Sequence, residues 1–410
     1  MPDTINVIVD ENNEHSWERI ETTYDEYGEI QTRVVIYDNG IEEFEEYYIG
    51  QLQNKVAVDT LDEFNWQYKG EVYDGNGALV ERGTEFDDGV AYLWLYEAGQ
   101  LTDFLQIDSE NVKTWDLIGT TYNEIGQIEE RSVTYDSGVA HIWFYQDGKS
   151  TNSVKIDPEN VEPWHIVQTY YDASGQIENR ETRYDDGQIK FEYFENGTRI
   201  STEQLDGFMS WETAPVDGGA KAWESIYTSY DASGVISGRT IAYDNGAMKE
   251  ETYVDGVKAD AMLLDVLDNA SWDTIEFNYD ENGKIANTTT IFDDSTSRQS
   301  LYENGVLNAV YRFDAEDGSN GVYDWYGKLD LYAPDGQLMI SGTEYDNGDE
   351  VYLIYQDGEK LTRIENDADG SDPWLMKVTD YSGQDPITTL YDNVDDIPEE
   401  YQDFFWMGTV

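Results

Sequence analysis

The residues best suited to chemistry in this sequence are aspartates grouped around glycines in its C-terminal third. Asp367, Asp369 and Asp372 stand in the segment Asp-Ala-Asp-Gly-Ser-Asp. Carboxylates spaced in this way around a glycine bend can wrap a hard cation, as short Ca²⁺-binding loops do. Asp314 and Asp317 form a similar segment, Asp-Ala-Glu-Asp-Gly-Ser. We therefore predict Ca²⁺ as a cofactor with these five aspartates as ligands; the alternative is that both segments are acidic turns.

Residues that could support catalysis are scarce. The histidines His15, His141 and His165 show no metal-ligand spacing, and the last two stand beside tryptophans in segments expected to be strands. The sequence contains no Gly-x-Ser-x-Gly elbow, phosphate-binding loop or dinucleotide fingerprint. Acidic pairs occur throughout the chain, so they cannot single out the two carboxylates of a glycosidase. We predict that the protein is not an enzyme.

Tryptophans at a fixed step mark a tandem repeat that runs through the whole chain. The intervals between them are 49, 49, 49, 59, 49, 53 and 49 residues. A period sustained in this way predicts an array of one supersecondary unit, and we predict a single repeat domain over residues 1–410. The units are expected to start at Trp17, Trp66, Trp115, Trp164, Trp223, Trp272, Trp325 and Trp374.

Turn signals divide each unit into four segments of about nine residues. In the first unit these signals are Tyr24-Asp25-Glu26-Tyr27-Gly28, Tyr37-Asp38-Asn39-Gly40 and Gly50, followed by a closing aspartate, Asp59. Asn-Gly and Asp-Gly pairs tolerate the positive φ of tight hairpins, and the segments between them are rich in Tyr, Thr, Ile and Val. The pattern predicts four antiparallel strands, A to D, in each unit. The fold class is all-β.

The two ends of the chain suggest how the array is arranged. Residues 4–10 carry the pattern of a strand D, and the last unit has strands A and B, with Tyr401 at the spacing of the strand C aromatic. Pairing the N-terminal strand with the last unit would complete an eight-bladed β-propeller-like ring and remove exposed edges. The alternative is an open, extended β-meander or solenoid in which each unit contacts only its neighbours. We expect the ring.

Two length changes break the repeat, and both fall in the connection from strand D to the next strand A. The usual step of seven residues becomes 17 between Asp206 and Trp223, and 11 between Asp314 and Trp325. Loops that vary on a repetitive scaffold are common binding positions. We predict Trp211 and Asp217, in the longer insertion, as partner-binding residues; the alternative is an inert insertion.

The charge of the chain limits the choice of partners. The sequence has 87 acidic and 24 basic residues and a formal net charge of −63. Such a field repels nucleic acid and anionic membranes and attracts cations or basic partners. Alternatively, the charge forms a solvated surface adapted to salt. We predict binding to a protein or glycan surface, with no nucleic-acid partner and no insertion into a membrane.

The sequence carries few signals of its location. It has no run of 18 apolar residues, and its start, Met1-Pro2-Asp3-Thr4, lacks the basic segment and apolar core of a Sec-type signal peptide. It contains no cysteine, which excludes disulfides and thiolate metal sites but leaves the compartment open.

The repeat resembles a known pattern. The order Trp, Tyr-Asp-x-x-Gly, Arg, Tyr-Asp-Asp/Asn-Gly and a closing Asp is similar to tandem repeats of large secreted RTX-type calcium-binding proteins of marine bacteria. The arginine of the pattern stands here as Arg33, Arg82, Arg131, Arg180 and Arg239. The resemblance implies export without a cleaved leader, an extracellular setting and calcium. The chain lacks the Gly-Gly-x-Gly-x-Asp nonapeptide, so calcium-driven β-roll folding does not carry over.

Three functions are compatible with these observations. The first is a non-enzymatic, extracellular, adhesin-like β-repeat scaffold, stabilised by cations, that presents its D–A loops to a partner. The second is a structural component of a virus particle, such as a tail fibre or surface decoration, which would make the protein virion-associated. The third is a glycan-processing propeller enzyme. We expect the first.

Overall fold

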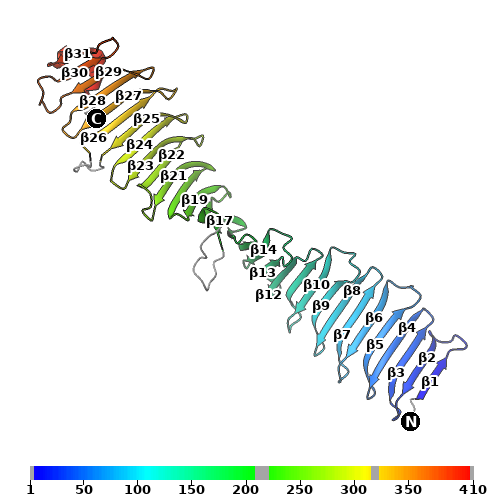
Figure 1. Cartoon of the computed structure of the whole chain (residues 1–410). Helices are drawn as coiled ribbons and strands as arrows, with labels where there is room; N and C mark the ends of the chain where they lie inside the picture. Colours follow the sequence, from blue (N-terminus) through cyan, green and yellow to red (C-terminus); the bar gives the residue numbers. More distant parts are fainter. Residues whose placement is uncertain (1–3, 208–220, 315–322, 407–410) are drawn as a thin grey trace. The chain divides into compact units, whose positions relative to one another are not determined.

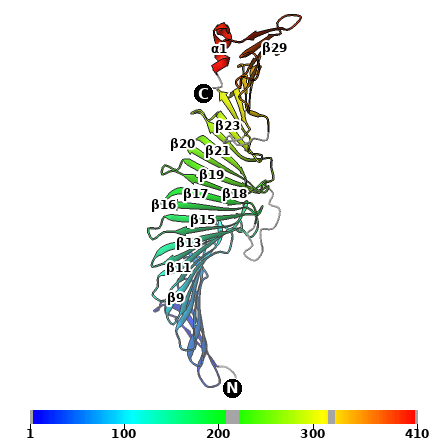
Figure 2. The same ribbon diagram turned by 90° about the vertical axis from the view of Figure 1, so that its left-hand side faces the viewer.

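The computed structural model describes residues 4–207, 221–314 and 323–406 of the chain. Its 31 strands belong to one antiparallel sheet that does not close into a barrel. The chain forms two compact units, Met1–Gly197 and Thr198–Val410. Within each unit the strands follow one another in chain order, as Figures 1 and 2 show.

The strands fall into the four repeat positions expected from the sequence. Strands A are β2 (Trp17–Tyr24), β6 (Trp66–Tyr73), β10 (Trp115–Tyr122), β14 (Trp164–Tyr171), β18 (Trp223–Tyr230), β22 (Trp272–Tyr279), β26 (Trp325–Tyr332) and β30 (Met376–Asp380). Strands B are β3 (Ile30–Tyr37), β7 (Leu79–Phe86), β11 (Ile128–Tyr135), β15 (Ile177–Tyr184), β19 (Ile236–Tyr243), β23 (Ile285–Phe292), β27 (Leu338–Tyr345) and β31 (Ile387–Tyr391).

Strands C and D complete the repeat. Strands C are β4 (Ile41–Tyr48), β8 (Val90–Glu97), β12 (Ala140–Gln146), β16 (Ile189–Glu195), β20 (Ala247–Val254), β24 (Ser297–Glu303) and β28 (Glu350–Gln356). Strands D are β1 (Thr4–Val9), β5 (Gln51–Asp59), β9 (Gln100–Asp108), β13 (Lys149–Ile156), β17 (Thr198–Leu205), β21 (Val257–Asp265), β25 (Val306–Phe313) and β29 (Glu359–Asn366). The all-β, tandem-repeat prediction is confirmed.

The predicted turns form because their residues tolerate left-handed backbone. In the C–D turn of the third unit, Asp147 and Gly148 have φ values of 52° and 75°. Positive φ at both central residues is the signature of the two-residue hairpin that matches strand twist, and it favours Asp-Gly and Asn-Gly. In the A–B turn of the first repeat, one aspartate oxygen closes the loop: Asp25 Oδ1 accepts the amides of Tyr27 and Glu29, each at 2.8 Å.

The ring prediction is wrong for this sheet, because successive units are joined by a backbone ladder. Blades of a propeller are separate sheets, whereas here strand D of one unit pairs with strand A of the next, as Ile107 pairs with Leu117 between β9 and β10. The N-terminal strand follows the same rule: β1 pairs with β2, from Thr4 opposite Tyr24 to Val9 opposite Arg19. Residues 4–9 therefore extend the first unit and do not complete the last one.

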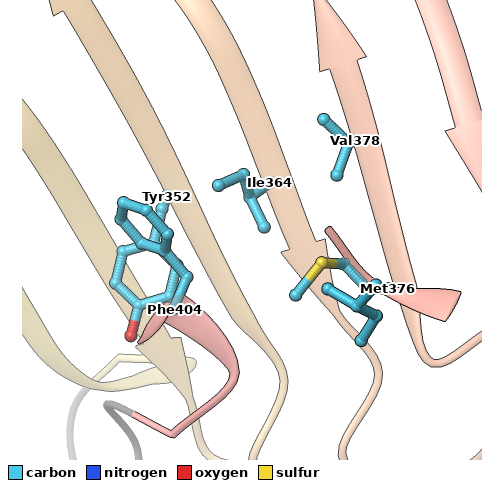
Figure 3. Packing of buried hydrophobic residues seen from close by; sticks show 6 residues of the cluster. Tyr352, Ile364, Met376, Val378 and Phe404 are labelled. Atoms are coloured by element: carbon cyan, nitrogen blue, oxygen red, sulfur yellow. The ribbon is translucent and has the colours of Figure 1, made fainter. Parts of the chain in front are cut away.

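The last strand C is also replaced. The prediction placed Tyr401 in a strand, but it lies in α1 (Glu399–Trp406), which follows the short 3₁₀ helix η1 (Val394–Asp396). This segment packs on the C-terminal end of the second compact unit, Thr198–Val410. Phe404 lies against Tyr352 of β28 with ring centroids 5.3 Å apart (Figure 3).

The apolar cluster beneath α1 comprises six buried residues, Tyr352, Ile364, Met376, Val378, Ile397 and Phe404. Pro398 precedes α1 and excludes a regular strand ladder there, since proline cannot donate to one.

Among the described residues, no helix has the length and apolarity required to cross a bilayer.

Candidate functional site at the loops between strands D and A

The closing aspartate of every unit acts as a clamp on the D–A loop. One carboxylate oxygen accepts the backbone N–H of the residue that stands two positions before the next tryptophan. Asp59 binds Phe64, Asp108 binds Lys113 and Asp157 binds Glu162, each at 2.6 Å. Asp10 with His15 and Asp265 with Ala270 repeat the contact. A charge-assisted bond of this kind fixes where strand A can start.

The clamp is kept where the loop is longer. Asp206 binds the amide of Lys221 at 2.8 Å, and Asp314 binds that of Tyr323 at 3.0 Å, in both cases two residues before the tryptophan. The aspartate and the start of strand A are therefore held together as they are beside a short loop. Trp211, Asp217 and Asp317, which the sequence predicted as binding residues, lie outside the described residues.

Of the metal ligands predicted in the last D–A loop, Asp367 and Asp369 lie together, whereas Asp372 does not join their cluster. Asp367 is the clamp of its unit: its two oxygens accept the amides of Ser371 at 3.2 Å and Asp372 at 2.9 Å. Asp314, 3% exposed, has the same role. Asp372 contributes its backbone N–H to this loop. Asp314 and Asp367 thus close their D–A loops through their carboxylates.

A different trio of carboxylates does come together. Asp349, Asp367 and Asp369 each offer an oxygen within 4.8 Å of the others. Asp349 belongs to the B–C turn, which lies beside the D–A loop: its Oδ1 accepts the amide of Ala368 at 3.1 Å. Hydrogen bonds from Ser371, followed by one shared with Asp367, hold the pKa of Asp369 below its usual range. Sequence reasoning missed Asp349 because nothing in the local pattern shows that these two loops meet.

The same meeting of loops recurs in another unit of the repeat. Asp268 and Asp273, at the D–A connection, lie with Asp293 of the B–C turn so that their carboxylate oxygens are within 4.8 Å of one another. Burial, followed by repulsion from Asp268 and Asp273, raises the pKa of Asp293. In the second repeat, a base lies where the two loops meet, because Lys113 Nζ of the D–A loop lies 3.0 Å from Asp88 Oδ2 of the B–C turn. Where D–A loops meet B–C turns, carboxylates thus gather in two repeats and pair with a lysine in another.

The one strongly perturbed histidine is packed against an aromatic ring. His141 of β12 lies on Trp143 with ring centroids 3.5 Å apart. Burial, assisted by the charge of Lys155, lowers its pKa to about 4. Its cross-strand neighbours are Val133 and Lys155. This arrangement keeps the imidazole neutral, and none of the described residues forms a hydrogen bond with its Nε2.

Ion pairs on the strands have structural roles of the same kind. Burial alone would raise the pKa of Glu251, but hydrogen bonds from Lys249, Lys258 and Tyr253 outweigh it and lower the pKa to about 2. The two ammonium groups lie 2.8 and 2.6 Å from the carboxylate. A buried charge satisfied by one cation from β20 and one from β21 stabilises the register of these two strands.

Comparisons with known proteins add little to this description. No protein-family model matches the chain, and no curated protein matches it. Solved structures that it is similar to include a Photorhabdus luminescens Tc holotoxin pore (13% identity, TM-score 0.17) and TcdB2-TccC3-TEV (14%, TM-score 0.20), each covering 93% of this chain. The chain spans only 22% of those proteins. Saccharomyces cerevisiae Sqt1 matches at 11% identity and a TM-score of 0.13 over 88% of this chain and 93% of its own. Similarities this distant carry no argument about function.

The clamp can be tested at Asp157, which is 1% exposed. Replacing it by Ala removes the acceptor for the Glu162 amide, and we expect the free energy of unfolding to fall by about 1–3 kcal/mol. Asp157→Asn, which keeps an acceptor oxygen, should recover part of this loss. The exposed Asp116→Ala is the matched control, expected to stay within about 0.5 kcal/mol of wild type. Urea unfolding checks the series, and equal stability of Asp157→Ala and Asp116→Ala would contradict the clamp.

The position of His141 predicts a pH dependence of stability. Its pKa falls from the ordinary 6.5 to about 4 on folding, so the unfolded chain binds the proton more tightly. The contribution of the neutral imidazole to the free energy of unfolding is therefore complete above about pH 6.5. It is lost as the pH falls from there to about 4. We expect the melting temperature of wild type to drop more across this window than that of His141→Gln. His165→Gln, at an exposed position, should show the same drop in melting temperature as wild type. If His141→Gln shows the same drop too, the folded protein does not hold the His141 imidazole in its neutral form.

Proposed function

We propose that this chain is a non-enzymatic β-repeat scaffold that acts outside the cell and binds the surface of a partner protein, as adhesins do. The observation that carries the proposal is the ladder between strand D of each unit and strand A of the next. It adds one identical unit after another, which suits a spacer or display surface. Each neighbour supports the next, as in other solenoid arrays.

The polar residues of the described part of the chain support a non-catalytic role. The most buried aspartates clamp loops, the perturbed histidine is stacked on tryptophan, and Glu251 is bound to two lysines. Reactive groups in enzymes instead converge on a position that a substrate can reach. The extracellular setting is supported by the likeness of the Tyr-Asp repeats to those of secreted RTX-type proteins.

The proposal includes stabilisation by a divalent cation. The motive is a net charge of −63 together with Asp349, Asp367 and Asp369 in one cluster. Bulk repulsion is relieved by any salt, whereas a bound ion adds a term set by its concentration over its dissociation constant. Carboxylate oxygens from two loops would then hold Ca²⁺ and join the D–A loop to the B–C turn.

We expect millimolar Ca²⁺ in about 0.5 M NaCl to raise the melting temperature by an amount equivalent to about 2.7 kcal/mol at a hundredfold excess over the dissociation constant. Asp349→Asn and Asp369→Asn should reduce this shift. Asp372→Asn is the matched control and should keep it, because Asp372 supplies a backbone N–H to the loop. If Ca²⁺ does not raise the melting temperature in that salt, or if Asp349→Asn keeps the full rise, the cluster is an acidic turn and not a Ca²⁺ site.

The scaffold function itself calls for two measurements on the full chain. Beads carrying the protein are applied to surfaces coated with a basic protein, an acidic protein or a neutral glycan in about 0.15 M NaCl. In parallel, the chain is assayed on polysaccharide, ester and phosphoester substrates. We expect retention on the basic protein surface, because the acidic field attracts it, and no turnover. Turnover abolished by a single carboxylate substitution would overturn the proposal, and so would a failure to be retained on any surface.

A further inference from the structure

Strands β3 to β9 sort their charges between the two faces of the sheet. Their basic residues, Arg33, Lys55, Lys69 and Arg82, share one face by register. Each is engaged there: Arg33 with Glu45 at 3.8 Å, Lys55 with Glu43 at 3.1 Å, Arg82 with Glu71 at 2.7 Å, and Lys69 over the Trp66 ring at 4.0 Å. We call this the paired face. The opposite face of these strands has no basic side chain and is called the acidic face.

An apolar stripe crosses the acidic face from strand to strand. Each member is the direct cross-strand partner of the next: Val34, Phe44, Val56, Gly70, Gly83, Leu93 and Leu105. Phe44 is 43% exposed and Val56 38% exposed. Val34, Phe44 and Val56 line a groove of about 340 Å³, whose other lining residues are Thr32, Arg33, Glu45, Glu46 and Asn54.

Two glycines leave the middle of the stripe without side chains. Gly70 and Gly83 face each other across β6 and β7. A Cβ placed on Gly70 would meet nothing within 4 Å, and one on Gly83 would touch its neighbours only at 3.9 Å. Here another backbone can approach the sheet closely.

Carboxylates border the stripe on both sides. On β4, Glu42 and Glu46 stand two residues on either side of Phe44, and on β7, Glu81 and Glu85 stand in the same way around Gly83. Asp103 adds a fifth on β9. None of these five carboxylates is within ion-pair distance of a base in the described part of the chain, whereas their counterparts on the paired face are.

We propose that this stripe is the binding site for a basic amphipathic α-helix of a partner protein. The inference rests on the proposed scaffold function and names the partner of that scaffold. An apolar row flanked on both sides by carboxylates that make no ion pair with the described residues, two on one side and three on the other, is complementary to an apolar helix face bordered by Lys and Arg. The helix lies across the strands, and its cations meet Glu42 and Glu85 on one side and Glu46, Glu81 and Asp103 on the other.

The dimensions agree with a helix of ordinary length. Seven strands at about 4.8 Å spacing make a stripe roughly 29 Å long, which matches an α-helix of about 20 residues. The carboxylate rows lie two residues from the stripe along each strand, so they are roughly 13 Å apart, slightly more than the 10–12 Å diameter of a helix. The side chains of an extended peptide alternate between two opposite directions, so they cannot face the stripe and the carboxylates on both of its sides at once.

The test uses the full chain and a labelled synthetic helix of about 20 residues, with Leu at helical spacing and Lys on both borders. Its control peptide has the same composition in scrambled order. Fluorescence anisotropy in about 0.15 M NaCl gives the affinities. We expect the amphipathic peptide to bind at least about tenfold more tightly than the scrambled one.

Two variants locate the site. Val56→Lys places a cation in the stripe, and Val254→Lys makes the same change in net charge at a position of β20 that is 63% exposed. We expect Val56→Lys to weaken peptide binding at least about tenfold and Val254→Lys to leave it unchanged. Glu42→Gln with Glu46→Gln should weaken binding and make it less sensitive to salt.

Equal affinity for the two peptides would show that bulk charge alone attracts them, and equal affinity of Val56→Lys and wild type would place the site elsewhere; either result overturns the inference. Retention of the beads on basic protein distinguishes this failure from that of the scaffold function. If retention persists while the peptide does not bind, the scaffold stands and the stripe does not. If both are absent, both fail.

Discussion

The backbone hydrogen bonds between strand D of one unit and strand A of the next set every other feature of this protein. They make one antiparallel sheet, and within each compact unit the described strands form a single layer, covered only by the C-terminal segment with α1 (Figure 2). In a sheet of a single layer, the side chains of the sheet itself must shield the backbone hydrogen bonds from water. Short side chains therefore occupy many of the buried positions, as Thr22, Thr84, Thr120 and Thr169 do, and longer neighbours cover them. The apolar cluster under α1 is the exception, because a helix covers that end.

This way of shielding explains why charged residues lie in the centre of strands. Arg33 and Glu45 are cross-strand partners beside buried Thr22, and their long apolar stems cover the threonine while their ends pair. The ion pairs of Glu251 with Lys249 and Lys258 are the most buried example of the same arrangement. Surface ion pairs contribute little each, so their value here is in register and cover more than in Coulomb energy.

The repeat and the strand positions were predictable from sequence, but the way units join was not. Trp17 to Trp325 do begin strands, because the aromatic period and the Asp-Gly turns are local signals. The ring was predicted wrongly because a connection of seven residues from strand D to strand A is compatible with two arrangements. It can close a hairpin within one sheet, or it can lead into a new propeller blade. The closing aspartate is a regular signal, but the sequence does not show that its carboxylate accepts an amide of the following loop, as Asp157 does from Glu162. Asp349 was missed for a related reason, since its place beside Asp367 follows from that hairpin.

The clamp also determines where the array can vary. Lengthening a loop costs little, growing only with the logarithm of its length, provided that its two ends stay fixed. Asp206 and Asp314 fix those ends on amides two residues before the next tryptophan, so both insertions leave the strand register intact. The faces have no such freedom in length, because a one-residue slip would exchange them. They can vary only by substitution at alternate positions, and through that alternation strands β3 to β9 carry paired bases on one face and apolar and acidic residues on the other.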